Sequence, residues 1–140
     1  MSRIFWDTNL FIYLLEDHGR LTERVTHLAE RMHERDDQLF TSTMTLGEVL
    51  VRPAARGESD LCRKYEDVLA RRSILVPFDR EAARIYATAR QDKAIKPPDA
   101  IQLACAAQAR VDLFITNDDR LSGKTIPGIQ FIVSLGRAFL

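Results

Sequence analysis

The sequence Arg3-Ile4-Phe5-Trp6-Asp7-Thr8-Asn9-Leu10-Phe11-Ile12-Tyr13-Leu14-Leu15 contains two apolar runs separated by three polar residues. The first run is short and rich in aromatic and β-branched residues, which is typical of a buried strand. The second run is too apolar for a surface segment and indicates the start of a helix packed on a sheet. The polar residues therefore fall at the carboxyl end of a strand, where open α/β folds place their ligands.

The rest of the chain repeats this order of strand and helix. Short apolar segments predict further strands at residues 38–42, 73–77, 111–116 and 130–133. Helical spacing predicts helices over residues 20–36, from Leu46 to Pro53, around residues 61–69, over 80–92, and from Asp99 onward. Alternating strands and helices favour one α/β domain over residues 1–140. Its central parallel sheet would have four or five strands, with helices on both faces.

Composition excludes several classes of protein. The 20 basic residues equal the 20 acidic ones, so the formal net charge is zero, which argues against a polyanion binder that uses its whole surface. The two cysteines, Cys62 and Cys105, have no metal-ligand spacing, and Cys105 lies among alanines as a small core residue would. No apolar stretch is long enough to cross a membrane, and no signal peptide is evident. We therefore expect a soluble, cytoplasmic protein.

Four acidic residues lie where they can meet. Asp7 follows the first strand and Asp118 follows the fourth, so both fall at one edge of a parallel sheet. Glu48 lies in the first turns of the helix after the second strand, and Asp99 opens a helix that is apolar nearly all round. Four carboxylates gathered at one edge would repel each other without cations. Oxygen ligands of this kind suit Mg²⁺ or Mn²⁺ rather than zinc.

Each acid also has a purely structural explanation. Asp7 and Asp99 are suitable helix caps, and Asp118 with Asp119 is suited to a turn. Glu48 lies opposite an apolar stripe, where most glutamates are simply solvated. No histidine falls in these motifs, and we expect surface positions for all three: His18, His27 and His33.

Taken together, these segments resemble the four acidic motifs of PIN-domain nucleases. They are Asp7-Thr8-Asn9 after a strand, Glu48 in Thr45-Leu46-Gly47-Glu48-Val49, Asp99-Ala100 opening an alanine-rich helix, and Thr116-Asn117-Asp118 after a strand. The order of the motifs and the small size of the chain look most like the VapC-type toxins of bacterial toxin–antitoxin pairs. The resemblance covers almost the whole chain.

The resemblance implies a metal-dependent endoribonuclease that hydrolyses RNA phosphodiester bonds. Its Mg²⁺, or Mn²⁺ in its place, would be bound by Asp7, Glu48, Asp99 and Asp118, and would activate a water for in-line attack. Four polar residues match positions that support such a site: Thr8, Asn9, Thr116 and Asn117. Asp119 is an extra acid that the family does not require. Trp6 is bulkier than the usual aliphatic residue there, and either narrows the site or fills the core.

The resemblance also implies partners. A VapC-type toxin forms a homodimer and is inhibited by a separately encoded antitoxin, whose peptide would cover the acidic site. The apolar helices near residues 10–15 and 44–70 are candidate contacts for it. Arg52 and Lys96 are candidate contacts for RNA phosphates, with solvated surface positions as the alternative.

Other functions remain to be weighed. A PIN nuclease of RNA processing and a non-catalytic RNA- or protein-binding module of the same fold are the main alternatives. A phosphoacceptor receiver domain would need a lysine after its last strand, and none follows Val133. A haloacid-dehalogenase-like phosphatase would need a second aspartate where Asn9 stands.

Overall fold

The centre of the molecule is a parallel sheet. The computed structural model describes residues 1–138 and residue 140. The strands are β1 (Arg3–Trp6), β2 (Gln38–Ser42), β3 (Ile74–Val76), β4 (Leu113–Thr116) and β5 (Phe131–Ser134). They lie in the order β3-β2-β1-β4-β5, and each neighbouring pair is parallel. The prediction of an α/β fold with a parallel sheet is confirmed, with five strands in the described residues.

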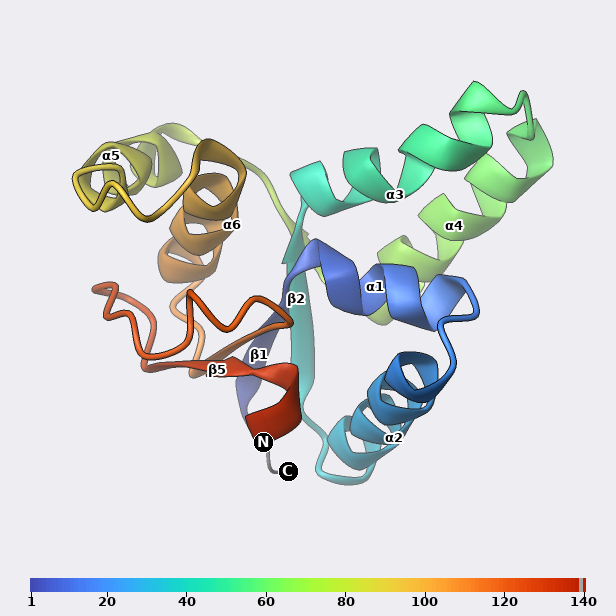
Figure 1. The fold of residues 1–140 in the computed structure, drawn as a ribbon, viewed down its shortest axis with the longest axis horizontal. Coiled ribbons are helices and arrows are strands. Elements are labelled where there is room, and N and C mark those ends of the chain that lie inside the picture. Colours follow the sequence, from blue (N-terminus) through green and yellow to red (C-terminus); the bar gives the residue numbers. More distant parts are fainter. Residues whose placement is uncertain (139) are drawn as a thin grey trace.

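Helices cover both faces of this sheet, also as predicted (Figure 1). On one side lie α1 (Thr8–Leu15), α2 (Arg20–Glu34), α3 (Thr43–Ala55) and α4 (Ser59–Arg72), while α5 (Arg80–Ala89) and α6 (Pro97–Gln108) lie on the other. A short 3₁₀ helix, η1 (Leu135–Arg137), follows β5. Within the part of the chain that the structure describes, no helix combines the length and apolarity that crossing a membrane requires.

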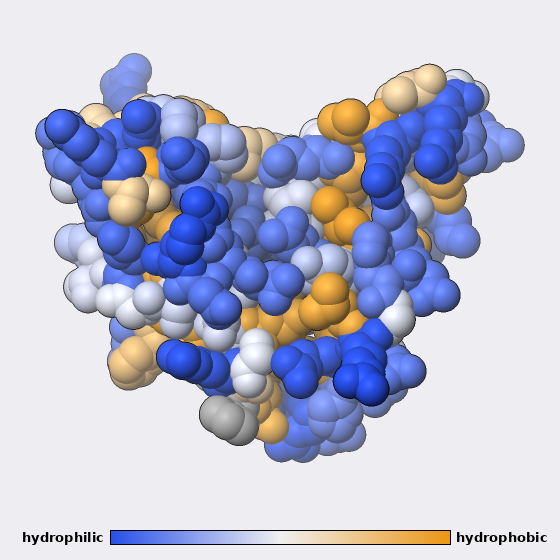
Figure 2. Space-filling model, viewed as in Figure 1, coloured by the Kyte–Doolittle hydropathy of each residue, from blue (hydrophilic) through white to orange (hydrophobic). Residues whose placement is uncertain are grey.

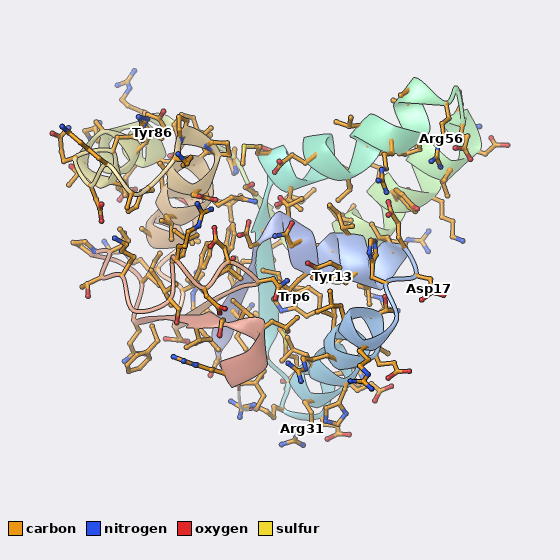
Figure 3. The ribbon with its side chains drawn as sticks, in the orientation of Figure 1. Trp6, Tyr13, Asp17, Arg31, Arg56 and Tyr86 are labelled. Carbon is orange, nitrogen blue, oxygen red and sulfur yellow. The ribbon has the colours of Figure 1, made fainter. Side chains whose placement is uncertain are left out.

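Side chains of β1 alternate between the two layers of the core. Ile4 and Trp6 pack in the cluster beneath α1 and α2, whereas Phe5 points to the cluster beneath α5 and α6. Phe5 stacks on Phe114 of β4 with ring centroids 5.2 Å apart. Trp6 is fully buried beside α1 (Figure 3) and packs on Phe11 with a centroid separation of 5.2 Å. Trp6 therefore fills the core, which decides between its two predicted roles.

Two predicted helix boundaries were wrong because of prolines. Helix α3 does not end at Pro53 but continues to Ala55, with the proline ring buried. Pro53 cannot donate the backbone hydrogen bond to the carbonyl four residues before it, yet the helix continues for two residues beyond the proline. Helix α6 begins at Pro97 rather than at Asp99. Prolines are tolerated in a first turn because N–H groups there have no partner within the helix.

The order of the strands places a crevice at the carboxyl edge of the sheet. The chain runs from β1 outward to β2 and β3 on one side, and later to β4 and β5 on the other. Connections thus diverge on either side of β1, and ligands of open α/β sheets bind at such a point. The backbone N–H of Asp7 donates to the carbonyl of Ile115 at 3.0 Å, so the two strand ends are joined there.

Candidate acidic site at the carboxyl edge of the sheet

Asp7 is the most buried acid of the site, with 7% of its surface exposed. It is the N-cap of α1, since its Oδ1 accepts a hydrogen bond from the Thr8 N–H at 2.9 Å. Its Oδ2 accepts a second bond from the Thr116 hydroxyl at 2.8 Å. The predicted capping role is therefore confirmed, and Thr116 supports this carboxylate from β4. Burial, with the negative charges of Asp99 and Glu48 adding to it, raises the pKa of Asp7.

Glu48 is held toward Asp7 by a hydroxyl. It lies on α3 and is exposed, so its rotamer is free to vary unless something fixes it. Thr8 at the start of α1 donates its hydroxyl to Glu48 Oε1 at 2.7 Å. This bond joins the first and second predicted motifs and distinguishes Glu48 from a simply solvated side chain.

Asp99 does not cap α6, contrary to one expectation. The N-cap is Lys96, and Asp99 lies in the first turn, where its carboxylate accepts no hydrogen bond from a residue that the structure describes. A cavity of about 340 Å³ brings Asp99 together with Asp7 and Glu48, and residues of α1, α3 and α6 line it. The surface is hollowed between the α5–α6 side and the α3–α4 side of the molecule (Figure 2). Burial and the nearby carboxylate of Asp118 raise the pKa of Asp99.

Asp118 does not line this cavity, although it lies close enough to Asp99 to raise the pKa of that acid. Its carboxylate forms a bidentate ion pair with Arg120, with Nε–Oδ1 at 3.0 Å and Nη2–Oδ2 at 2.7 Å. The Arg120 N–H also donates to Oδ1 at 3.0 Å, which is the predicted turn role of an aspartate. These bonds lower the pKa of Asp118, in contrast to the raised pKa of Asp7 and Asp99.

The buried side chain of Gln102 connects residues of the first two motifs by hydrogen bonds, a role that the sequence analysis did not predict. The side chain on α6 is 1% exposed. Its Nε2 donates to the Thr8 hydroxyl at 2.8 Å and to the Thr45 hydroxyl at 2.7 Å, and it lies 3.3 Å from Asp7 Oδ1. Its Oε1 accepts from the hydroxyl of Ser42. One signal was available, because this amide is the lone polar side chain within an apolar run and a buried amide needs partners.

The remaining predicted residues are spread around the cavity. Asn9 is exposed and lines it, whereas Asn117 donates to the Tyr13 hydroxyl at 2.8 Å, on α1 (Figure 3). Asp119 is exposed, and its side chain makes no hydrogen bond or ion pair with a residue that the structure describes. The structure thus gathers Asp7, Glu48 and Asp99, places Asp118 next to them, and leaves Asp119 outside.

The two basic candidates also differ. Lys96 is exposed at the start of α6, and its charge partly offsets that of Asp99. Arg52 is exposed and forms an ion pair with Glu16 at 3.1 Å, at a second cavity that Glu48 also lines. Other basic residues of this region lie farther off, as Arg56 does at the distal end of α3 (Figure 3). All three histidines are exposed, as predicted.

The donor set fits a hard divalent cation. Every candidate ligand is a carboxylate oxygen, and the acids repel each other strongly enough to influence each other's pKa values. In the conformation described, however, no three carboxylate, imidazole or thiol groups lie close enough to bind one ion, among residues 1–138 and 140. Glu48 and Asp118 are instead bonded within the protein, to Thr8 and Arg120. The residues present are therefore suitable, and binding requires their side chains to rearrange.

Comparison with solved structures finds similar folds, among them toxin–antitoxin complexes. VapBC2 from Rickettsia felis, bound to a DNA fragment from its promoter, contains a chain with a TM-score of 0.70 and 16% identity over 94% of this chain and 98% of that one. A toxin–antitoxin complex from Klebsiella pneumoniae contains a chain with a TM-score of 0.67 and 25% identity, over 90% of this chain and 94% of that one. FitAcB from Neisseria gonorrhoeae contains a chain with a TM-score of 0.62 and 25% identity, over 83% of this chain and 88% of that one. A search of curated protein sequences found no match.

A family comparison covers most of the chain. The sequence model of the PIN domain matches residues 4–125, a range that contains all four acids and the Gln102 network. This agrees with the motif resemblance and with the parallel sheet whose switch point lies between β1 and β4. PIN domains are in general nucleases. By sequence and by fold, the chain belongs to the PIN-domain family.

Proposed function

We propose that the protein is a metal-dependent endoribonuclease and the toxin of a toxin–antitoxin pair. One observation carries the nuclease proposal: Asp7, Glu48 and Asp99, far apart in the sequence, line one cavity at the switch point of the sheet. Asp118 lies next to them and acts electrostatically on Asp99. Membership of the PIN-domain family supports the same reading.

Asp7, Glu48, Asp99 and Asp118 would hold Mg²⁺, for which Mn²⁺ can substitute. Bound there, the ion would supply Lewis-acid chemistry, activating a water and stabilising the charge that develops during phosphodiester hydrolysis. Asp7 needs the least rearrangement, because Thr8 N–H and Thr116 fix its orientation. Glu48 already lines the same cavity, and it would bind the ion by releasing or sharing the hydroxyl of Thr8.

Substrate binding would depend on few cations. Lys96 stands at the start of α6, three residues before Asp99, and is free to approach a phosphate. Arg52 lies at the adjoining cavity with Glu16 as its partner. Both are exposed, which suits contact with the backbone of a flexible single strand.

The toxin proposal draws on the similar structures. The toxin–antitoxin complex from Klebsiella pneumoniae, 25% identical, supports an antitoxin protein as the partner of this chain. A homodimer is what the resemblance to VapC-type toxins implies. Ile12 and Val51, the latter 63% exposed, lie on α1 and α3 at the cavity that also contains Glu48. An apolar antitoxin segment placed there would cover the acids and block RNA.

Cleavage of labelled RNA by the purified chain tests the proposal. The wild type and Asp7→Asn would be compared in Mg²⁺, Mn²⁺ and EDTA, with single-stranded DNA of the same sequence as a second substrate. Asp79→Asn is the matched control, because Asp79 also caps a helix, α5, but lies outside the cavity. Asparagine caps helices about as well as aspartate, so both variants should fold.

We expect RNA cleavage that requires a divalent cation, is lost in Asp7→Asn and is retained in Asp79→Asn. Cleavage by Asp7→Asn at the wild-type rate would contradict the site assignment. Binding of RNA without cleavage by either protein in either metal would favour the non-catalytic module. Coexpression with the product of an adjacent small reading frame tests the toxin role, since an antitoxin should abolish the activity.

A further inference from the structure

Arg120 holds Asp118 more completely than a chance surface contact would. Its guanidinium contacts both carboxylate oxygens, Oδ1 through Nε and Oδ2 through Nη2. The backbone N–H of the same residue adds a third bond to Oδ1. Such a bidentate pair is directional as well as charged, and it occupies the oxygens that a metal ion would use.

The position of Arg120 extends this effect to the neighbouring acid. The charge of Arg120 acts on Asp99, where it outweighs that of Lys96. Among the described residues, Arg120 is the one cation hydrogen-bonded to any of the four acids of the site. Its side chain is 68% exposed, whereas that of Asp118 is 20% exposed, so the arginine can swing into solvent while the aspartate stays in place.

We propose that Arg120 is an internal counter-ion of the acidic site, which neutralises Asp118 in the metal-free protein and competes with a divalent cation for it. The inference rests on the proposed metal-dependent function. It explains how the fold accommodates Asp118 near Asp99, because the guanidinium offsets the charge of the Asp118 carboxylate. Metal binding would then include the release of the guanidinium from Asp118.

If Arg120 competes with the metal ion for Asp118, removing it should have the opposite effect on metal affinity from removing a residue that only positions Asp118. If Arg120 only positioned Asp118, its removal would weaken metal binding. If it competes, its removal tightens metal binding, because the cation no longer has to displace a bound group. Exposed ion pairs are weak, so the gain in Mn²⁺ affinity should be about three- to tenfold.

The experiment measures Mn²⁺ affinity by isothermal titration calorimetry and by the electron paramagnetic resonance signal of free Mn²⁺. The full chain is compared with Arg120→Gln, Arg120→Lys and Asp7→Asn. Arg63→Gln is the matched control, because Arg63 pairs with Asp60 on exposed α4, away from the cavity. Thermal denaturation with and without Mn²⁺ gives a second readout that does not depend on catalysis.

We expect Arg120→Gln to bind Mn²⁺ about three- to tenfold more tightly than the wild type. Arg120→Lys should lie between them, and Arg63→Gln should match the wild type. The shift in Tm on adding Mn²⁺ should be larger for Arg120→Gln. Equal or weaker binding by Arg120→Gln, with saturable wild-type binding that Asp7→Asn abolishes, overturns the counter-ion proposal and leaves the metal site intact. No saturable binding by either protein overturns both.

Discussion

Replacing Gln102 by leucine tests whether the buried amide organises the acidic site. Leucine keeps the approximate size of the side chain but removes every hydrogen bond that the amide makes. The amide contributes one accepted bond, from Ser42, and two donated bonds, to Thr8 and Thr45. All four side chains are at least 94% buried, so water cannot replace the lost partners.

The size of the effect follows from which groups lose a partner. The Ser42 hydroxyl loses its acceptor, whereas Thr45 can still accept a bond from Thr41 at 2.8 Å. An unsatisfied buried hydroxyl and two lost bonds together should cost roughly 2–4 kcal/mol of the free energy of unfolding. For a chain of this size that corresponds to a fall in Tm of about 5–15 °C.

The hydrogen bonds run from donor to acceptor in a chain, from Gln102 to Thr8 and from Thr8 to Glu48. Because the amide donates to the Thr8 oxygen, the hydroxyl hydrogen of Thr8 is left to point at Glu48. Without the amide, Thr8 is free to turn that hydrogen elsewhere. Gln102→Leu should therefore weaken Mn²⁺ binding in addition to lowering stability. A purely structural role would lower stability alone.

Gln102→Glu separates these two effects. A carboxylate can still accept from Ser42, but its second oxygen would lie about where Nε2 is, 3.3 Å from Asp7 Oδ1. Repulsion raises the pKa of such an introduced acid, so stability relative to the wild type should fall as pH rises from 5 to 7. Gln108→Leu is the control on the same helix, because its amide makes one exposed bond, to Asp79. Denaturation and Mn²⁺ titration that match the wild type for Gln102→Leu would refute the reasoning.

Two glycines, two cysteines and one acid provide further tests of the packing and electrostatics of the fold. Gly128→Ala should lower the free energy of unfolding by more than about 2 kcal/mol, because φ is +100° and a Cβ would lie 2.7 Å from the Ala107 carbonyl oxygen. Gly47→Ala, in open space on α3, should instead stabilise by about 0.5–1 kcal/mol; chemical denaturation measures both. Cys105, whose pKa burial raises to about 12, should react with a thiol reagent only on unfolding, after the half-buried Cys62. Asp7 has a pKa raised above 3.8, so it binds protons more tightly in the folded state, and metal-free stability should fall as pH rises through that folded-state pKa. Asp7→Asn should gain stability relative to the wild type over the same range, and an unchanged difference between pH 4 and pH 7 would contradict this.

The sequence predicted the sheet and the acids at its edge because both follow from periodicity. Parallel strands place their carboxyl ends together, so residues directly after them, such as Asp7 and Asp118, need no further information to be brought near each other. The role of Glu48 was harder to predict, because a single contact fixes the orientation of this exposed side chain. That contact, from Thr8, depends on how α1 packs on α3.

The features that escaped prediction are tertiary ones. Gln102 is bonded to residues 57–94 positions away, and no local pattern specifies those distances. The role of Arg120 depends on the conformation of a short turn. Pro53 was misread because proline usually ends a helix, whereas here the helix continues past a buried proline ring. In each case the local residue type permitted several outcomes, and packing selected one.

The charge balance at the site predicts the order of binding. Asp7 and Glu48 accept hydrogen bonds only from neutral hydroxyl and N–H groups, and Asp99 accepts none from a described residue. No bonded cation therefore cancels the negative charge of these three acids. The protein as a whole has a formal net charge of zero and offers no strong compensating field. An RNA phosphate would be repelled from this cavity until divalent cations reverse its charge. RNA affinity, measured by fluorescence anisotropy with a cleavage-resistant oligonucleotide, should thus be far weaker in EDTA than in Mg²⁺. Equal affinities in the two buffers would contradict this order, and would mean that RNA is held by the surface rather than by the acids.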